Sequence, residues 1–144
     1  MRSSVKKGEE FELLVKKILD GIIARTKAEF RAEVLRHPKL MGFSTKWDPD
    51  LVLMARSLLH PLERSLELAV FECKYVDETA SEGTYWSQMS RGYMILNDLR
   101  LVYREDLQFY LVANRYTKSK ERDYPKVFRS IGVKVININD PKEQ

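Results

Sequence analysis

Hydrophobic positions along the chain follow two different spacings, and these predict alternating helices and strands. Between residues 8 and 25, apolar side chains recur every three or four positions, as on the buried face of an amphipathic helix. A second stretch of this kind runs from residue 82 to residue 102. Gly21 lies inside the first stretch. Because glycine disfavours the helical conformation, we expect the first helix to bend or end there.

Apolar runs and alternating apolar and polar positions predict five strands. They cover residues 30–35, 50–54, 66–76, 107–113 and 133–138. An irregular stretch at 40–49, a turn at 59–65 and a short helix at 124–131 lie between them. Strands that are apolar on both faces and interleave with helices indicate an α/β domain with a mixed central sheet flanked by helices. A chain of 144 residues is too short for two comfortable cores, so we expect one domain over residues 1–144.

Composition narrows the class of protein only modestly. Hydrophobic residues make up 44% and charged residues 32%, as in a globular domain, and the net charge of +4 slightly favours an anionic partner. Cys73 is the only cysteine, which excludes an intramolecular disulfide framework, a cysteine-based zinc cluster and an iron–sulfur site. No apolar run is as long as a membrane span. We therefore expect an intracellular, cytoplasmic protein that does not associate with membranes.

Charged residues interrupt the most apolar predicted strands. Asp50 opens the strand at 50–54, and Glu72 and Lys74 are two positions apart, so that both point to one side of their strand. We expect Glu12, on the first predicted helix, to approach the same side of the sheet. Carboxylates that converge repel one another unless a cation lies among them, and oxygen donors favour Mg²⁺ or Mn²⁺.

A cationic side chain beside such an ion completes a set of groups suited to hydrolysing a phosphodiester. The ion neutralises the charge that develops on phosphate, and Lys74 would orient the attacking water or take its proton. The sequence contains no glycine-rich phosphate-binding loop that would indicate a nucleotide enzyme. The residues therefore favour metal-assisted hydrolysis of nucleic acid.

The spacing of these residues resembles a known signature. Pro49-Asp50, followed by Glu-Cys-Lys at residues 72–74 at the end of a strand, is similar to the motif of the PD-(D/E)XK nuclease superfamily. The sequence GEEFE at residues 8–12 is similar to the first-helix motif of its archaeal Holliday junction resolvases and Mrr-like restriction endonucleases. The order helix, three strands, helix, strand also matches that family core, up to about Ala113.

This resemblance implies a restriction-endonuclease-like fold and a metal-dependent DNA endonuclease, either structure-specific or restriction-like. It implies that the cation, Mg²⁺ or Mn²⁺, is held by Glu12, Asp50, Glu72 and the backbone carbonyl of Cys73, while Lys74 serves the water. Gln88, on the second predicted helix, corresponds to a glutamine near the active site in several branches. DNA is the implied partner, and because many relatives cut both strands as dimers, the resemblance also allows a homodimer.

Each of these residues also has a structural interpretation. Glu12 would be a solvated helix residue if it paired with Lys16 one turn later. Asp48 competes with Asp50 as a ligand, but it precedes a proline, as turn residues often do, whereas Asp50 enters the apolar strand. His37 and His60 each precede a proline, so we expect both to be surface residues rather than general bases.

A basic segment follows the strand predicted at 107–113. It includes Arg115, Lys118, Lys120 and Arg122, which either form a solvated loop or contact DNA phosphates. Two other functions remain open: a nucleic-acid-binding or assembly subunit that has the nuclease fold without turnover, and a small-molecule α/β enzyme with a chance motif. The presence of Asp50, Glu72 and Lys74 together argues against the first of these.

Overall fold

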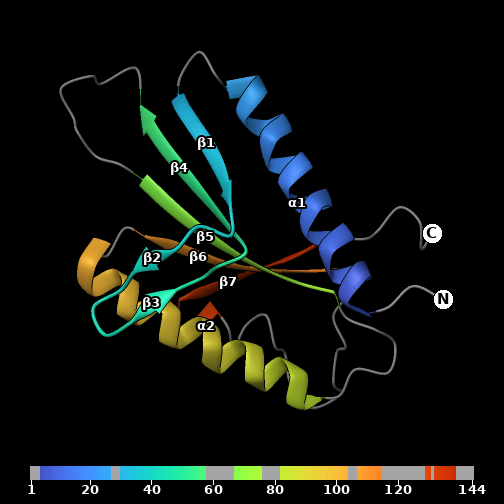
Figure 1. Ribbon diagram of the computed structural model, residues 1–144, viewed down its shortest axis with the longest axis vertical. Helices are drawn as coiled ribbons and strands as arrows, with labels where there is room; N and C mark the ends of the chain where they lie inside the picture. Colours follow the sequence, from blue (N-terminus) through green and yellow to red (C-terminus); the bar gives the residue numbers. More distant parts are fainter. Residues whose placement is uncertain are drawn as a thin grey trace.

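The computed structural model describes residues 4–26, 30–57, 67–75, 82–103, 107–114, 129–130 and 132–138. These residues form two long helices and seven strands (Figure 1). In chain order the elements are α1 (Ser4–Thr26), β1 (Phe30–Arg36), β2 (Leu40–Met41), β3 (Lys46–Trp47), β4 (Leu51–Ser57), β5 (Glu67–Lys74), α2 (Glu82–Tyr103), β6 (Gln108–Ala113) and β7 (Val133–Asn137).

The larger sheet is mixed, with strand order β1-β4-β5-β6-β7. Its first three strands pair antiparallel, whereas β5, β6 and β7 run parallel to one another. Parallel neighbours need a crossover, and α2 supplies the one between β5 and β6. Strands β2 and β3 form a separate two-stranded hairpin between β1 and β4. The mixed α/β fold predicted from the sequence is therefore confirmed.

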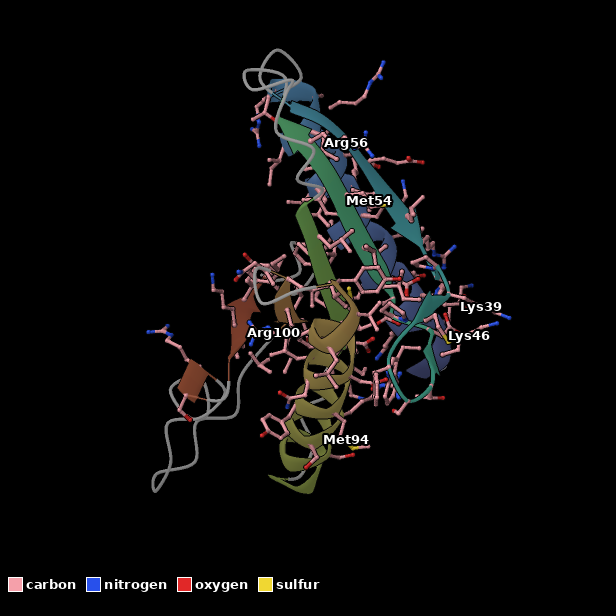
Figure 2. The ribbon with its side chains drawn as sticks, turned by 90° about the vertical axis from the view of Figure 1, so that its left-hand side faces the viewer. Lys39, Lys46, Met54, Arg56, Met94 and Arg100 are labelled. Atoms are coloured by element: carbon pink, nitrogen blue, oxygen red, sulfur yellow. The ribbon has the colours of Figure 1, made fainter. Side chains whose placement is uncertain are left out.

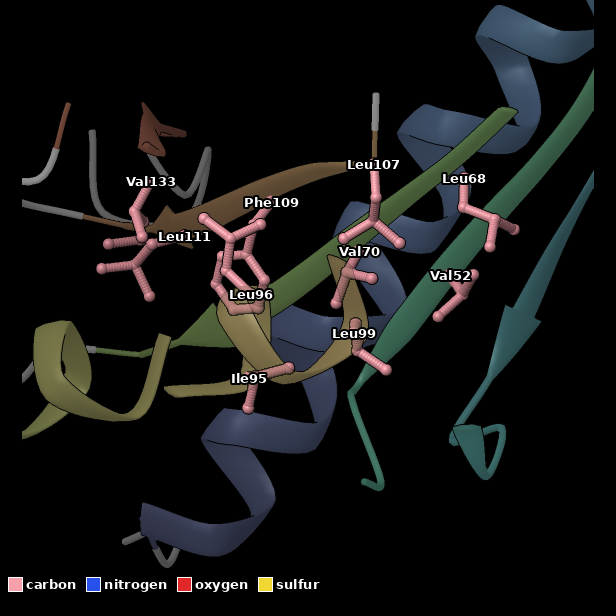
Figure 3. Packing of buried hydrophobic residues seen from close by; sticks show 11 residues of the cluster. Val52, Leu68, Val70, Ile95, Leu96, Leu99, Leu107, Phe109, Leu111 and Val133 are labelled. Atoms are coloured by element: carbon pink, nitrogen blue, oxygen red, sulfur yellow. The ribbon is translucent and has the colours of Figure 1, made fainter. Parts of the chain in front are cut away.

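The two helices pack against different sides of this sheet. On one side Ile95, Leu96 and Leu99 of α2 face Val70 of β5 and Phe109 of β6 in one buried cluster (Figure 3). On the other side a second cluster joins α1 to the sheet. Its buried members are Phe11, Val15, Val34, Leu51, Phe71 and Val112. Since successive strand residues point to opposite faces, β5 directs its even-numbered residues toward α2 and its odd-numbered residues toward α1.

Several features differ from the sequence-based prediction; the first helix, for example, begins at Ser4 rather than Gly8. The first helix does not end at Gly21 but continues to Thr26, and Gly21 has open space around it, so no close approach explains the glycine. Strand β4 continues to Ser57. The stretch at 40–49, predicted to be irregular, contains the β2–β3 hairpin. Two-residue strands are too short to produce a recognisable alternation of polar and apolar positions.

Other predicted features lie outside the described residues. These are the turn at 59–65, most of the short helix at 124–131, and the candidate DNA-binding residues Arg115, Lys118, Lys120 and Arg122. Of that predicted helix, residues 129–130 are described, and they are helical. Neither described helix is long and apolar enough to cross a membrane.

The β2–β3 hairpin is fastened to α2 through one buried carboxylate. The Oδ1 atom of Asp98 accepts a 2.8 Å hydrogen bond from the Ser44 backbone, and Oδ2 accepts one of 2.6 Å from the Trp47 indole. A Cβ atom on Gly42 would overlap this carboxylate, so only glycine fits there. These contacts hold a segment whose two ends lead to His37 and Asp50.

Candidate metal centre

Asp50 lies where the ends of three strands meet. Its backbone carbonyl accepts a 2.8 Å hydrogen bond from the His37 backbone, which continues the pairing of β1 with β4 by one step. Its side-chain Oδ2 accepts a 2.7 Å hydrogen bond from the Cys73 backbone near the end of β5. Backbone contacts from two directions thus position Asp50, whereas Asp48 is exposed to solvent.

Glu12 reaches this corner from α1 and is buried, with 5% of its surface exposed. Its Oε2 atom lies 2.7 Å from Nε of Arg36 and 2.9 Å from Nε2 of His37. Lys16 instead forms an ion pair of 2.8 Å with Asp20. The interpretation of Glu12 as a solvated residue paired with Lys16 is therefore wrong. A buried carboxylate needs such partners because desolvation is costly.

Glu12, His37 and Asp50 form a compact group of metal-ligand atoms. One ligand atom from each residue lies within 4.8 Å of the others. In an octahedral site with bonds of about 2.1 Å, adjacent ligands lie about 3 Å apart and opposite ligands about 4 Å apart. The observed spacing is thus close to what a divalent cation requires, and small side-chain movements would complete it.

Glu72 is buried without adequate partners. Its Oε1 atom has no hydrogen-bond partner within the described part of the chain, and Oε2 lies 3.8 Å from Nε of Arg91 on α2. Burial, and next the nearby Asp50 carboxylate, raise the pKa of Glu72 to about 8, although Arg91 and a backbone hydrogen bond from Asp50 oppose the rise. Without a cation, Glu72 therefore holds a proton through much of the neutral range.

Asp50 is perturbed in the same direction. Its pKa is raised to about 6, chiefly by burial; the hydrogen bond from Cys73 opposes the rise, and the Glu12 carboxylate contributes to it. Two neighbouring acids with raised pKa values are the arrangement that a divalent cation would relieve, because metal binding releases protons from its ligands. The donor set therefore fits a hard or borderline divalent ion.

The three acids do not lie on one side of the sheet, and the prediction that Glu12 approaches the side of Glu72 is wrong. Helix α1 packs on the face of β5 that bears Phe71, whereas Glu72 follows Val70 on the opposite face and pairs with Arg91 of α2. Asp50 stands between them and interacts electrostatically with both Glu12 and Glu72. The acids form a row around the strand ends, with Asp50 in its centre.

The other residues predicted for the site are on β5 and α2. Lys74 is on the same face of β5 as Glu72 and is partly exposed. Burial raises the pKa of the Cys73 thiol, and the carboxylates of Asp50 and Glu12 reinforce this, so the sulfur stays protonated in the metal-free protein. Gln88 lies on α2.

Sequence reasoning missed three cationic or imidazole side chains at the site. Arg36 and His37 pair with Glu12, and Arg91 faces Glu72. No sequence pattern around Arg91 indicates that it lies at the site. The positions of Arg36 and His37 do follow from one available signal, because antiparallel pairing of the first two predicted strands brings the end of one strand beside the start of the next.

Comparisons with known proteins support the fold. No family model matches the chain, and no curated protein matches its sequence. Among solved structures, AF1548, a protein of unknown function, superposes with a TM-score of 0.55 at 13% identity, over 86% of this chain and 54% of that one. A repair endonuclease from Pyrococcus abyssi superposes with a TM-score of 0.46 at 18% identity, over 85% of this chain and 46% of that one. The chain thus spans about half the length of these two proteins.

Proposed function

We propose that the protein is a metal-dependent DNA endonuclease of the PD-(D/E)XK type, which hydrolyses phosphodiester bonds. One observation supports this most directly. Glu72 is buried at the end of β5, beside Asp50 and two positions from Lys74, and its Oε1 atom has no hydrogen-bond partner among the described residues. Burying a carboxylate oxygen without a donor is costly in a structural role, and such an oxygen is suited to binding a cation.

Each residue of the row has a role in this proposal. Asp50, Glu72, Glu12 and the backbone carbonyl of Cys73 would hold Mg²⁺ or Mn²⁺. The bound ion supplies Lewis acidity toward the phosphate and makes water easier to deprotonate. Lys74 orients the attacking water or takes its proton, and Gln88 assists from α2.

The charge around the site favours a polyanionic substrate. Arg36 and Arg91 border the row of acids. Lys39 and Lys46 are exposed at the adjacent hairpin, Lys39 directly before β2 and Lys46 in β3 (Figure 2). Cations distributed over a surface in this way follow a phosphate backbone better than they would recognise a small metabolite. We further propose that Arg115, Lys118, Lys120 and Arg122 extend this contact.

A second candidate function is a DNA-binding or assembly subunit without turnover. The observation in its favour is that Glu12 already has two partners, Arg36 and His37, so this end of the row is neutralised without a metal ion. The two candidates differ in whether the metal site is used for hydrolysis.

A cleavage assay separates these candidates. Linear duplex, nicked duplex, flap, single-stranded and four-way-junction DNA would each be incubated with Mg²⁺, with Mn²⁺ and with chelator. We expect cleavage of at least one substrate that requires the metal. Lys74→Ala should lower turnover by about 100-fold or more and leave DNA affinity nearly unchanged, because its role is in the transition state.

The matched control is Lys17→Ala, which removes an exposed lysine of α1. It should cut at the parent rate. Parent-rate cleavage by Lys74→Ala would contradict the mechanism. Tight DNA binding with no cleavage of any substrate in either metal would favour the second candidate.

A further inference from the structure

His37 has a backbone conformation that few residues other than glycine adopt. Its φ angle is 51°, in the left-handed region, where histidine is tolerated better than most side chains. The hydrogen bond from its backbone N–H to Asp50 fixes the residue at the end of β1. With the backbone held in this way, Nε2 of the imidazole lies 2.9 Å from Oε2 of Glu12. Strained backbone of this kind often occurs at functional sites.

The imidazole is not needed to neutralise Glu12. Arg36 already contacts the same carboxylate oxygen at 2.7 Å. The His37 side chain is 46% exposed, so a cation from solvent can reach it. The separation of 2.9 Å between Nε2 and Oε2 is also close to the spacing of about 3 Å between adjacent ligands of an octahedral ion.

We infer that His37 is a nitrogen ligand of the divalent cation, together with Glu12 and Asp50, and that the site therefore selects Mn²⁺ or a similar borderline metal over Mg²⁺. This inference rests on the proposed metal centre and extends it from an all-oxygen donor set to a mixed one. Mg²⁺ strongly prefers oxygen ligands, whereas imidazole suits first-row transition metals.

Two further observations support a ligand at this place. The ligand atoms of Glu12, His37 and Asp50, which come from α1 and from the segments flanking the β2–β3 hairpin, all lie within 4.8 Å of one another. Independently, Glu72, the buried neighbour of Asp50, has an oxygen without a partner among the described residues. The Arg36 side chain is partly exposed, so it would have room to move away from Glu12 if a cation bound there.

Pulsed electron paramagnetic resonance on bound Mn²⁺ tests this directly. An imidazole nitrogen bonded to Mn²⁺ adds a nitrogen modulation to the electron spin echo, whereas water and carboxylate ligands contain no nitrogen and cannot produce it. The chain has two histidines, His37 and His60, so tag-free protein limits the source of such a signal to these residues. We expect the nitrogen modulation in the parent protein with less than one equivalent of Mn²⁺.

The variant His37→Asn should lose this modulation, and His60→Asn, its matched control, should keep it. Asparagine tolerates the left-handed backbone, so the turn before Pro38 is preserved. A melting curve in chelator verifies that both variants fold. Modulation that persists in His37→Asn, or that is absent from a parent protein with bound Mn²⁺, would overturn the inference.

Calorimetric titration supplies a second readout. His37→Asn should weaken Mn²⁺ binding by about tenfold or more and change Mg²⁺ binding little, since metal affinity falls by about 10–100-fold even when a partner of a ligand is lost. Equal weakening of both metals would contradict the selectivity.

The result is independent of cleavage. A nitrogen signal without cleavage of any DNA would support the ligand assignment and contradict the proposed nuclease. Metal-dependent cleavage without a nitrogen signal would support the proposed nuclease and contradict the assignment of His37 as a ligand.

Discussion

Two carboxylates in this protein are equally buried and have opposite surroundings. Asp98 on α2 and Glu72 on β5 each have 8% of their surface exposed. Asp98 receives hydrogen bonds of 2.6 Å from Trp47 and 2.8 Å from Ser44. Glu72 has one oxygen with no partner in the described parts of the chain, and its other contacts are weak: Arg91 lies 3.8 Å from the second oxygen, and the Asp50 backbone donates to the carboxylate only enough to oppose part of the rise in its pKa.

The pKa values of the two groups diverge accordingly. Burial tends to raise the pKa of Asp98, but the hydrogen bonds from Trp47, Ser44 and Thr45 outweigh burial and bring it below its ordinary value. Burial and the Asp50 carboxylate raise the pKa of Glu72 to about 8, and the Arg91 guanidinium and the Asp50 backbone oppose this rise only in part. Equal surface exposure therefore does not determine the charge state of a buried acid. The balance between burial, neighbouring charges and hydrogen-bond donors does, because donors stabilise the charged form.

The largest difference should appear in catalysis. Glu72→Gln and Asp50→Asn should each lower single-turnover cleavage by about 100-fold or more and weaken Mn²⁺ binding, because each removes a ligand oxygen. Asp98→Asn, measured at a temperature where it is folded, should cleave within about threefold of the parent, since Asp98 contacts the hairpin and not the row of acids. Unchanged Mn²⁺ affinity in both Glu72→Gln and Asp50→Asn would contradict the metal assignment.

The second difference should appear in thermal stability. Here we expect the Asp98 variant to be affected strongly and the Glu72 variant little, the reverse of the order expected for cleavage. Asp98→Ala leaves the Trp47 indole N–H and the Ser44 backbone N–H without their acceptor, so the midpoint of thermal unfolding should fall by about 5 °C or more. In chelator, Glu72→Gln should melt at the parent temperature or slightly above it, because the change removes an unfavourable buried acid.

Glu33→Ala, which removes an exposed carboxylate of β1, is the control and should melt with the parent. Calorimetric unfolding of all four proteins checks the order. If Glu72→Gln proved as destabilised as Asp98→Ala, Glu72 would be a structural residue.

The sequence predicted which residues share a face of a strand, but it did not predict how the helix and the strands bring the acids together. Alternation along β5 correctly placed Glu72 and Lys74 on one face, since strand periodicity depends only on neighbouring residues. The side from which Glu12 approaches depends on where α1 packs, and a single amphipathic stripe does not specify which face of a sheet it covers.

The partners of the acids were predictable only in part: pairing of the first two strands brings Arg36 and His37 to Asp50, whereas no local pattern indicates Arg91. His37 and Arg91 come to the site from a turn and from a helix, and their contacts join residues far apart in the chain. Asp98 was not noticed because its importance depends on a hairpin whose strands have two residues each. Local patterns therefore identified the acids, and only tertiary contacts show which of them lack donors.

The two carboxylates should also affect stability at different pH values: Glu72 at high pH and Asp98 at low pH. The pKa of Glu72 rises from 4.5 to about 8 on folding, so the folded metal-free protein binds the extra proton. Its contribution to stability is full below about pH 4.5 and is lost as the pH rises through about 8. Asp98, with a lowered pKa, contributes stability that is lost only as the pH falls through that lowered value.

In chelator, the melting temperature should therefore fall between about pH 6 and about pH 9. Added Mn²⁺ should reduce this fall, and Glu72→Gln should remove most of it. A parent protein whose melting temperature does not change over this range in chelator would show that Glu72 ionises as an ordinary exposed acid does.

The smallest effect concerns Arg91, the one cation that the described contacts place near Glu72. Its guanidinium lies 3.8 Å from the Glu72 carboxylate and lowers the pKa of that group, but the arginine side chain is 47% exposed. Ion pairs with an exposed partner are weak and are screened by salt. In Arg91→Ala, the pH at which the chelated protein loses stability should therefore move upward only slightly, and the shift should disappear in about 1 M salt. Arg91→Lys should reverse part of this shift.

The matched control is Arg56→Ala, which removes an exposed arginine of β4 and should leave the pH at which stability is lost unchanged. An equal shift in both alanine variants would mean that net charge causes the effect, and Glu72 would then lack even this partner in solution.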